Sequence, residues 1–160
     1  MIDLNREREL LNRRVLGWSL ACEFIEPGID LGRDIRLVQT AKGLDLASVS
    51  GMDNLAQVLE IALTTRLGDD LFNVQFGFDG LNALAEETNA VLMRERIRIA
   101  VILVLRKDPR IRRIVDVKLE DGRLEEPVPG GSRQLEVRVA FETVSGEQAS
   151  INLGRVVTNG

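Results

Sequence analysis

Cations gather in one stretch of this 160-residue chain. Residues 94–113 contain eight Lys or Arg side chains and two carboxylates, although the whole chain has a net charge of -4. The dipole of a helix favours cations in its last turn, which explains those near the predicted helix end. It does not explain Arg110, Arg112 and Arg113, which lie beyond that end. Because a guanidinium pairs well with carboxylates and carbonyls, the stretch predicts a surface for an acidic partner protein, with a solvated helix face as the alternative.

Catalytic chemistry is restricted by what the chain lacks. It contains no His, no Tyr and one Cys, Cys22. This composition excludes Ser-His-Asp and Cys-His nucleophilic sites, imidazole general bases and the usual zinc sites within this chain. Cys22 cannot form an intramolecular disulfide, so the sequence does not indicate an oxidising compartment. We therefore expect no enzyme activity, no metal and no cofactor.

The charge and hydropathy of the chain also limit its partners. A net charge of -4 argues against general nucleic-acid binding. The chain has no apolar run long enough to span a bilayer, and residues 1–6 lack the apolar stretch of a signal peptide. These features predict a cytoplasmic protein that does not insert into membranes.

A long apolar helix must position the cations. Asn89 or Thr88 caps it, and Pro109 ends it just after Lys107. One apolar stripe comprises Met93, Ile97, Ala100, Val101 and Val104, and a second comprises Leu92, Ile99 and Leu103. Two apolar faces predict that this helix packs on another helix and on a sheet.

Shorter patterns predict the other elements. Residues 35–49 alternate as a hairpin, and residues 50–67 form an amphipathic helix that stops at Gly68. Residues 68–80 form a connection whose three phenylalanines, Phe72, Phe76 and Phe78, should anchor it in the core. Three alternating runs near residues 115–119, 135–141 and 149–153 predict an antiparallel meander with helices on one face.

Together these patterns predict an α+β fold in which two main helices pack on a small antiparallel sheet. Residues 1–34 form an N-terminal arm, and residues 35–157 form the compact domain. The arm carries Trp18, which either holds the arm to the core or anchors an interface.

The order of three motifs resembles a known family. DNLAQVLEIALTTRLGDDLF contains Thr64-Thr65-Arg66-Leu67-Gly68, the loop NVQFGFDGL contains Phe76-Gly77, and LRKDPRI contains Asp108-Pro109-Arg110. The first two are similar to the "Leu-Thr-Thr-x-x-Gly" helix and "Phe-Gly" loop of the baseplate-wedge family of contractile tails. Asp108-Pro109-Arg110 stands where that family has Glu-Pro-Arg. The family occurs in phage tails, type VI secretion systems and extracellular injection particles.

The resemblance implies a structural role without enzyme chemistry. The triplet, with Arg112 and Arg113, would bind the helical core bundle of the larger wedge proteins. The sheet would template the first sheath ring by strand addition, with hub or tube-initiator proteins as further candidate partners. Six copies would join one contractile particle. The sheath-facing residues would be Leu135, Val137, Val139, Ile151, Leu153 and Val156.

Two alternatives remain open on the sequence. One is a peptidoglycan-cleaving enzyme, because some members of this family have been described as lysozyme-like, and the 25 acidic residues always allow some carboxylate pair. The other is a soluble adaptor that binds a regulatory protein. An adaptor would act as a free monomer, whereas a wedge protein would co-purify with a particle.

Overall fold

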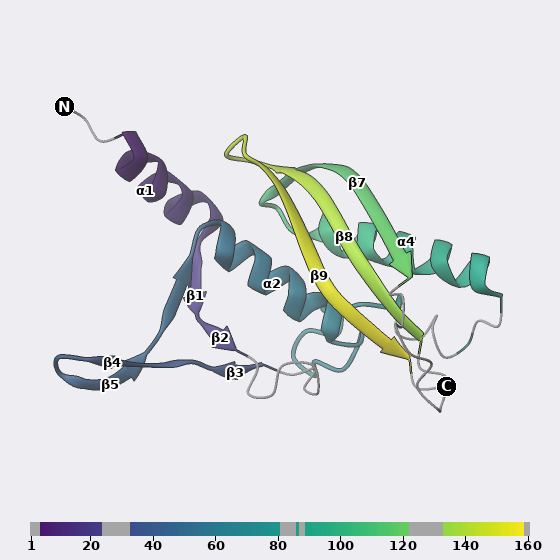
Figure 1. Ribbon diagram of the computed structural model, residues 1–160, viewed down its shortest axis with the longest axis horizontal. Helices are drawn as coiled ribbons and strands as arrows, with labels where there is room; N and C mark the ends of the chain where they lie inside the picture. Colours follow the sequence, from purple (N-terminus) through teal and green to yellow (C-terminus); the bar gives the residue numbers. More distant parts are fainter. Residues whose placement is uncertain (1–3, 24–32, 81–85, 87–88, 122–132, 159–160) are drawn as a thin grey trace. The chain divides into compact units, whose positions relative to one another are not determined.

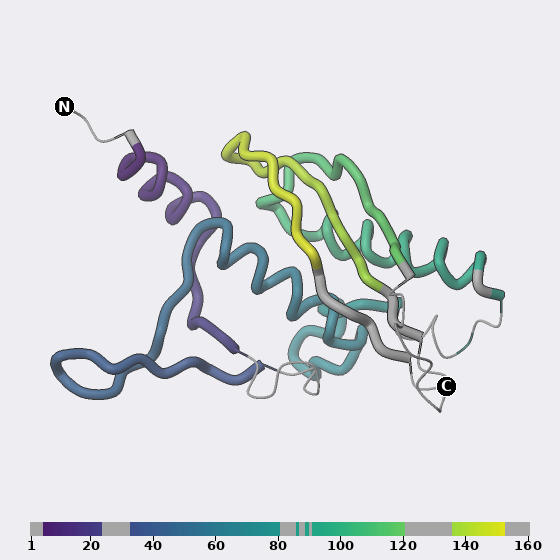
Figure 2. Tube along the Cα trace, viewed as in Figure 1, coloured from purple at the N-terminus to yellow at the C-terminus, as the bar shows by residue number. Residues whose placement is uncertain are grey.

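The computed structural model describes residues 4–23, 33–80, 86, 89–121 and 133–158 (Figures 1 and 2). Within these ranges the chain forms three helices and nine strands, and the strands form four separate sheets. The chain divides into two compact units, Met1–Val58 and Leu59–Gly160. The predicted architecture of two helices on one sheet is therefore wrong. The boundary between the units falls within a helix, whereas the sequence placed its boundary after residue 34.

The first unit shows why the strands do not join one sheet. Ala21, Arg36 and Ala47 each lie between two short strands, and their backbones are linked in a triangle of hydrogen bonds of 2.8 to 2.9 Å. At each of these three residues the chain leaves one partner strand and pairs with another. Three two-stranded sheets result, β1-β6, β2-β3 and β4-β5. The strands are β1 Trp18–Leu20, β2 Cys22–Glu23, β3 Asp34–Ile35, β4 Leu37–Thr40, β5 Gly43–Leu46 and β6 Ser48–Ser50.

Two helices flank these strands in the sequence. Helix α1, Leu4–Leu16, ends at Gly17, whose φ of +78° suits glycine. Helix α2, Met52–Thr64, follows Gly51 and runs through the boundary between the two units. The predicted turn at residues 40–43 is confirmed, because Thr40 pairs with Gly43 at the end of the β4-β5 hairpin.

The second unit contains the predicted meander. Strands β7 Ile111–Asp121, β8 Arg133–Thr143 and β9 Gln148–Thr158 pair antiparallel in the order β7-β8-β9. Helix α4, Ala90–Lys107, lies behind this sheet in Figure 1 and contacts β7. Asn89 caps α4 by accepting hydrogen bonds from Val91 N–H and Leu92 N–H at 2.9 and 3.3 Å. The order and direction of the three strands are confirmed.

The core of this unit uses only one stripe of α4. The stripe with Met93, Ile97, Ala100, Val101 and Val104 is buried, and Val139, Phe141 and Phe78 are at most 1% exposed. Leu92, Ile99 and Leu103 are each more than half exposed. The prediction that both stripes of α4 are packed is therefore wrong for the described residues.

The connection after α2 also differs from the prediction. Of its three phenylalanines, Phe78 is buried, Phe76 is half-buried and Phe72 is fully exposed. The expectation that Phe72 anchors the connection in the core is wrong, because the turn at Asp70 carries its side chain outward.

Candidate docking corner

The chain turns sharply between α4 and β7, and this turn, residues 106–113, is named the arginine corner here. Asp108 ends α4 in an extended conformation, as expected for a residue before proline. The N–H of Val144, in the β8-β9 turn, donates to Arg110 O at 2.9 Å. The corner is thus fixed by a helix on one side and a hairpin on the other.

Asp108 and Arg110 bind each other. The Asp108 carboxylate accepts Arg110 Nε–H at 2.8 Å, Arg110 N–H at 2.9 Å and a third bond from the guanidinium. The side chains are only 11% and 20% exposed. Burial alone would raise the pKa of Asp108, but hydrogen bonds and charge from Arg110 outweigh it and hold the pKa below 3.8. The triplet therefore stabilises the shape of the corner, and the guanidinium of Arg110 faces its own chain.

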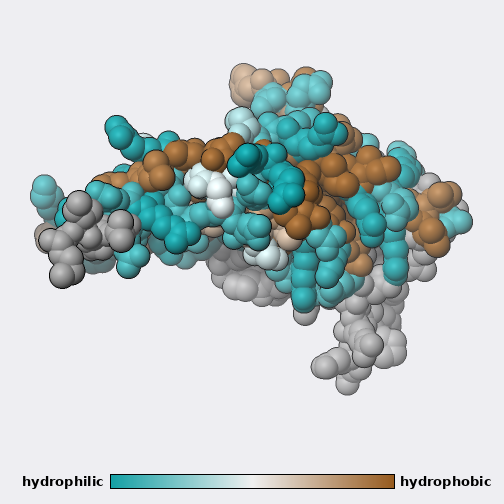
Figure 3. All heavy atoms as spheres, turned by 90° about the horizontal axis from the view of Figure 1, so that it is seen from above, coloured by the Kyte–Doolittle hydropathy of each residue, from teal (hydrophilic) through white to brown (hydrophobic). Residues whose placement is uncertain are grey.

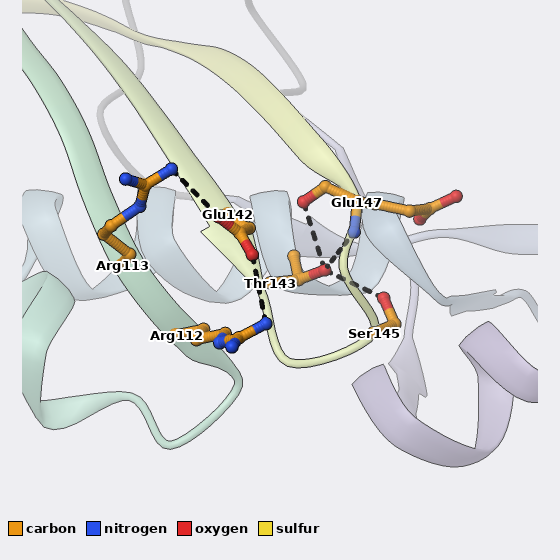
Figure 4. A network of polar contacts seen from close by, with 6 residues as sticks. All are labelled: Arg112, Arg113, Glu142, Thr143, Ser145 and Glu147. Carbon is orange, nitrogen blue, oxygen red and sulfur yellow. Dashed lines mark hydrogen bonds and ion pairs between the residues drawn. The ribbon is translucent and has the colours of Figure 1, made fainter.

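Arg112 and Arg113 point outward from the same turn. A β-bulge places Arg112 as an extra residue opposite β8, between the pairs Ile111–Thr143 and Arg113–Glu142. Glu142 consequently pairs with both arginines, at 3.3 Å from Arg112 and 3.1 Å from Arg113 (Figure 4). The two arginine side chains are 67% and 65% exposed. One carboxylate therefore holds two guanidiniums, and most of the surface of both arginine side chains stays exposed.

The β8-β9 turn beside Glu142 is stabilised by a buried threonine. Thr143 Oγ1 lies 2.8 Å from Ser145 Oγ, accepts from Glu147 N–H and is fully buried (Figure 4). Sequence reasoning did not identify Glu142 or Thr143, since each reads as one more position in an alternating strand. A threonine at an inward strand position is the only signal that could have indicated this role.

A shallow hollow of about 400 Å³ lies at the corner. Three isoleucines and three arginines line it: Ile102, Ile111, Ile114, Arg106, Arg112 and Arg113. The hollow combines apolar side chains with cations, which suits a partner that carries apolar and acidic side chains together.

The other two motifs of the resemblance meet at the exit of α2. Phe78 N–H donates to Thr65 O at 2.8 Å, and Leu67 N–H donates to Phe78 O at 3.3 Å. A Cβ on Gly77 would lie 2.8 Å from the carbonyl oxygens of Thr65 and Arg66, so only glycine fits there. Lys107 Nζ donates to Gln75 O at 2.9 Å, which joins this connection to the arginine corner.

Two amides of the first motif have structural roles that sequence reasoning missed. Asn54 Nδ2 donates to Leu16 O at 2.9 Å, and Gln57 bonds Cys22 N–H and Leu20 O, both at 2.8 Å. Both amides are buried and connect α2 to the backbone before and after β1. Their position on the apolar side of the helix was the available signal.

The residues expected to face a sheath lie in two different environments. Strand β8 lies between β7 and β9, and its Val137 and Val139 are buried, as is Ile151 of β9. These three side chains cannot form an exposed docking face. Leu135, Leu153 and Val156 lie in the paired strands β8 and β9, but the structure does not describe their side chains. Strands β7 and β9 are the outer strands of this sheet among the described residues, so each has one backbone edge that no other described strand pairs with.

Trp18 lies in β1, opposite Ser50, and is 60% exposed. The interpretation of Trp18 as a buried staple is therefore wrong, and the interface interpretation remains open.

Metal-binding clusters and membrane-spanning helices are absent from the part of the chain that the structure describes. No group of three or more His, Cys, Asp or Glu side chains in this part of the chain could hold a metal ion. None of the helices in the described ranges is both long enough and apolar enough to cross a bilayer.

Comparison with known proteins finds no protein-family model and no curated protein that matches the chain.

Proposed function

We propose that this chain is a structural baseplate-wedge component of a contractile injection system or phage tail. The arginine corner docks on the core bundle of the larger wedge proteins, and the sheet templates the sheath by strand addition. The observation that supports this most is the pair Arg112 and Arg113, which are held by Glu142 and exposed on a braced turn. Two guanidiniums that already pair with Glu142 lose less conformational entropy on binding an acidic surface than two that have no such partner.

We propose different roles for the arginines of the corner. Because Arg110 is bonded to Asp108, we assign contact with the partner to Arg112 and Arg113, and a positioning role to Asp108-Pro109-Arg110. Asp108, which is shorter than the Glu of the family, suits this positioning role because its carboxylate accepts hydrogen bonds from both the backbone N–H and the side chain of Arg110. Six copies per particle and contact with hub or tube-initiator proteins remain parts of the proposal.

The test is assembly with altered arginines. Replacing Arg112 and Arg113 with Ala should lower the free energy of unfolding by about 1–3 kcal/mol, because the two arginines are exposed but Glu142, which loses both of them, is only 18% exposed. Sheath-containing particles, counted by electron microscopy, should fall at least tenfold. The matched control is Lys118→Ala, which removes a cation that is also on β7 and 66% exposed. Normal particle numbers with the double variant would refute the docking role of the corner.

The same experiment separates the adaptor from the wedge. A wedge protein should sediment with particles, whereas an adaptor should stay free at low stoichiometry.

A further inference from the structure

The second apolar stripe of α4 is exposed along the helix. Leu92, Ile99 and Leu103 are 54%, 56% and 53% exposed, whereas the other apolar stripe of α4 is buried. Figure 3 shows apolar patches at several places on the described surface, so exposure alone does not mark a docking site. The spacing and the charges of this stripe indicate what kind of partner would fit it.

The exposed side chains repeat with the period of a coiled-coil seam. Steps of four, three, four and three residues connect five positions, which are named the α4 row: Leu92, Arg96, Ile99, Leu103 and Arg106. Side chains at these steps form one nearly straight row, about 21 Å long at 1.5 Å per residue. The backbone groups in the middle of α4 are bonded within the helix, so a partner must pack on the row through side chains. A second helix packs in this way.

The charges of the α4 row determine which helix would fit. Two of its five positions are arginines, and α4 as a whole contains five cations and one carboxylate. Arg96 lies 3.4 Å from Glu86 in an exposed pair, which contributes little. Arg106 has no ion pair with any residue that the structure describes. A partner with a carboxylate opposite Arg106 would neutralise it, whereas a second copy of α4 would bring five more cations and only one carboxylate.

The α4 row ends at the hollow of the arginine corner. Ile102 and Arg106 of α4 line this hollow together with side chains of β7, which belongs to the same unit. A helix on the row would therefore meet the hollow at its end and could place a side chain in it. A bilayer would also attract the cations, but its surface is flat and would not fill a hollow of about 400 Å³.

We infer that a helix with apolar and acidic side chains packs along residues 92–106 of α4 and ends at the hollow. Its apolar side chains would cover the three apolar positions of the α4 row, and a carboxylate would pair with Arg106. The inference deepens the proposed function, on which it rests, because it names an acidic helix as the docking partner of the arginine corner.

Fluorescence anisotropy with a synthetic peptide tests this inference on the purified full chain. The probe is a labelled peptide of about 20 residues, long enough to form a helix, with leucines at steps of four and three, glutamates beside them and alanines elsewhere. The control peptide has the same composition in an order without the leucine row. We expect the probe to bind about tenfold more tightly than the control peptide and to weaken as salt is added. Equal binding of the two peptides would overturn the inference, because charge alone would then explain it.

Variants of the chain locate the contact. The double variant Ile99→Ser with Leu103→Ser should weaken binding of the probe about tenfold, and so should Arg106→Glu, which leaves the Glu142 network intact. Val91→Ser is the matched control and should leave binding unchanged, because Val91 is 70% exposed on α4 but lies outside the α4 row. Circular dichroism melts establish that each variant folds. Binding that the variants of the row do not weaken would refute docking on α4.

Vesicles and particles distinguish the remaining outcomes. Sedimentation with phosphatidylserine vesicles, if it depends on Ile99 and Leu103 while the peptide does not bind, would identify a membrane as the occupant and overturn the inference. Particle counts separate it from the proposed function. Loss of particles with both the Ile99/Leu103 and the Arg112/Arg113 double variants supports both. Loss with the Arg112/Arg113 variant alone would refute only the helix on α4, and normal numbers with both variants would refute the proposed function as well.

Discussion

Asp108 illustrates how a single residue can fix the shape of a corner that we propose as a docking site. Its carboxylate is mostly buried, and three hydrogen bonds from Arg110 replace the water that it loses. Removing Arg110 would leave this carboxylate without its main partner. An Arg110→Ala variant would therefore disturb the corner as well as any docking surface, whereas Arg112 and Arg113 are themselves exposed.

The pH dependence of stability follows from the same pair. The pKa of Asp108 in the folded chain lies below its usual value of 3.8, so the pair stabilises the fold above that value. This contribution is lost as pH falls through the lowered folded pKa. Asp108→Asn should cost about 1–2 kcal/mol at pH 7, and the gap from wild type should close in strong acid. Urea unfolding of both chains from pH 7 to about pH 2 measures the gap. A gap that stays constant over this range would contradict the assigned ion pair.

At the scale of elements, the backbone of residues 77–78 approaches the backbone of residues 65–67 closely at the end of α2. The Leu-Thr-Thr and Phe-Gly motifs meet there, and Phe78 is buried against this exit. The connection must then pass close to the carbonyls of Thr65 and Arg66, which explains the glycine at position 77.

Gly77→Ala should destabilise the chain by about 2–4 kcal/mol, because it combines a φ of +108° with two contacts of 2.8 Å. Gly43→Ala is a matched control, since Gly43 has a φ of +115° and open space around it. We expect about 1–2 kcal/mol for the control. Thermal or denaturant unfolding measures both, and equal losses would show that the close approach at Gly77 has no cost.

At the scale of the whole molecule, the strand addition that we propose would use the outer side of β9. Thr143 N–H donates to Glu147 O, and inner and outer hydrogen bonds alternate from there along the antiparallel pair. Ser150, opposite Ala140, therefore directs its N–H away from β8. Deleting β9 would also remove the buried Ile151 and expose β8, so a point substitution is the better test.

Ser150→Pro should remove one outward donor and keep the ladder to β8, as proline does in outer strands. We expect a change in unfolding free energy of about 1 kcal/mol and, if β9 templates the sheath, baseplates without sheath. Ser150→Ala is the control, and electron microscopy of the particles is the measurement. Full-length sheaths on particles with the proline variant would exclude β9 as the template.

Elements with local signals could be predicted from the sequence. Helix α4, its cap at Asn89 and its end before Pro109, the β4-β5 turn and the three-strand meander could all be predicted from periodicity and turn chemistry. The sequence also located the cations of the arginine corner, because charge is a property of composition.

The partner of each short strand and the charges that face outward could not be read from the sequence and depend on the folded chain. Alternation in residues 35–49 looks continuous, yet the chain changes partners at Arg36 and Ala47, because pairing depends on Ala21 far away in sequence. Arg112 and Arg113 are turned outward by a bulge opposite Glu142, which lies 30 and 29 residues away, so no local pattern records their direction. Arg110 is turned inward by Asp108, a local contact whose geometry is visible only in the folded corner.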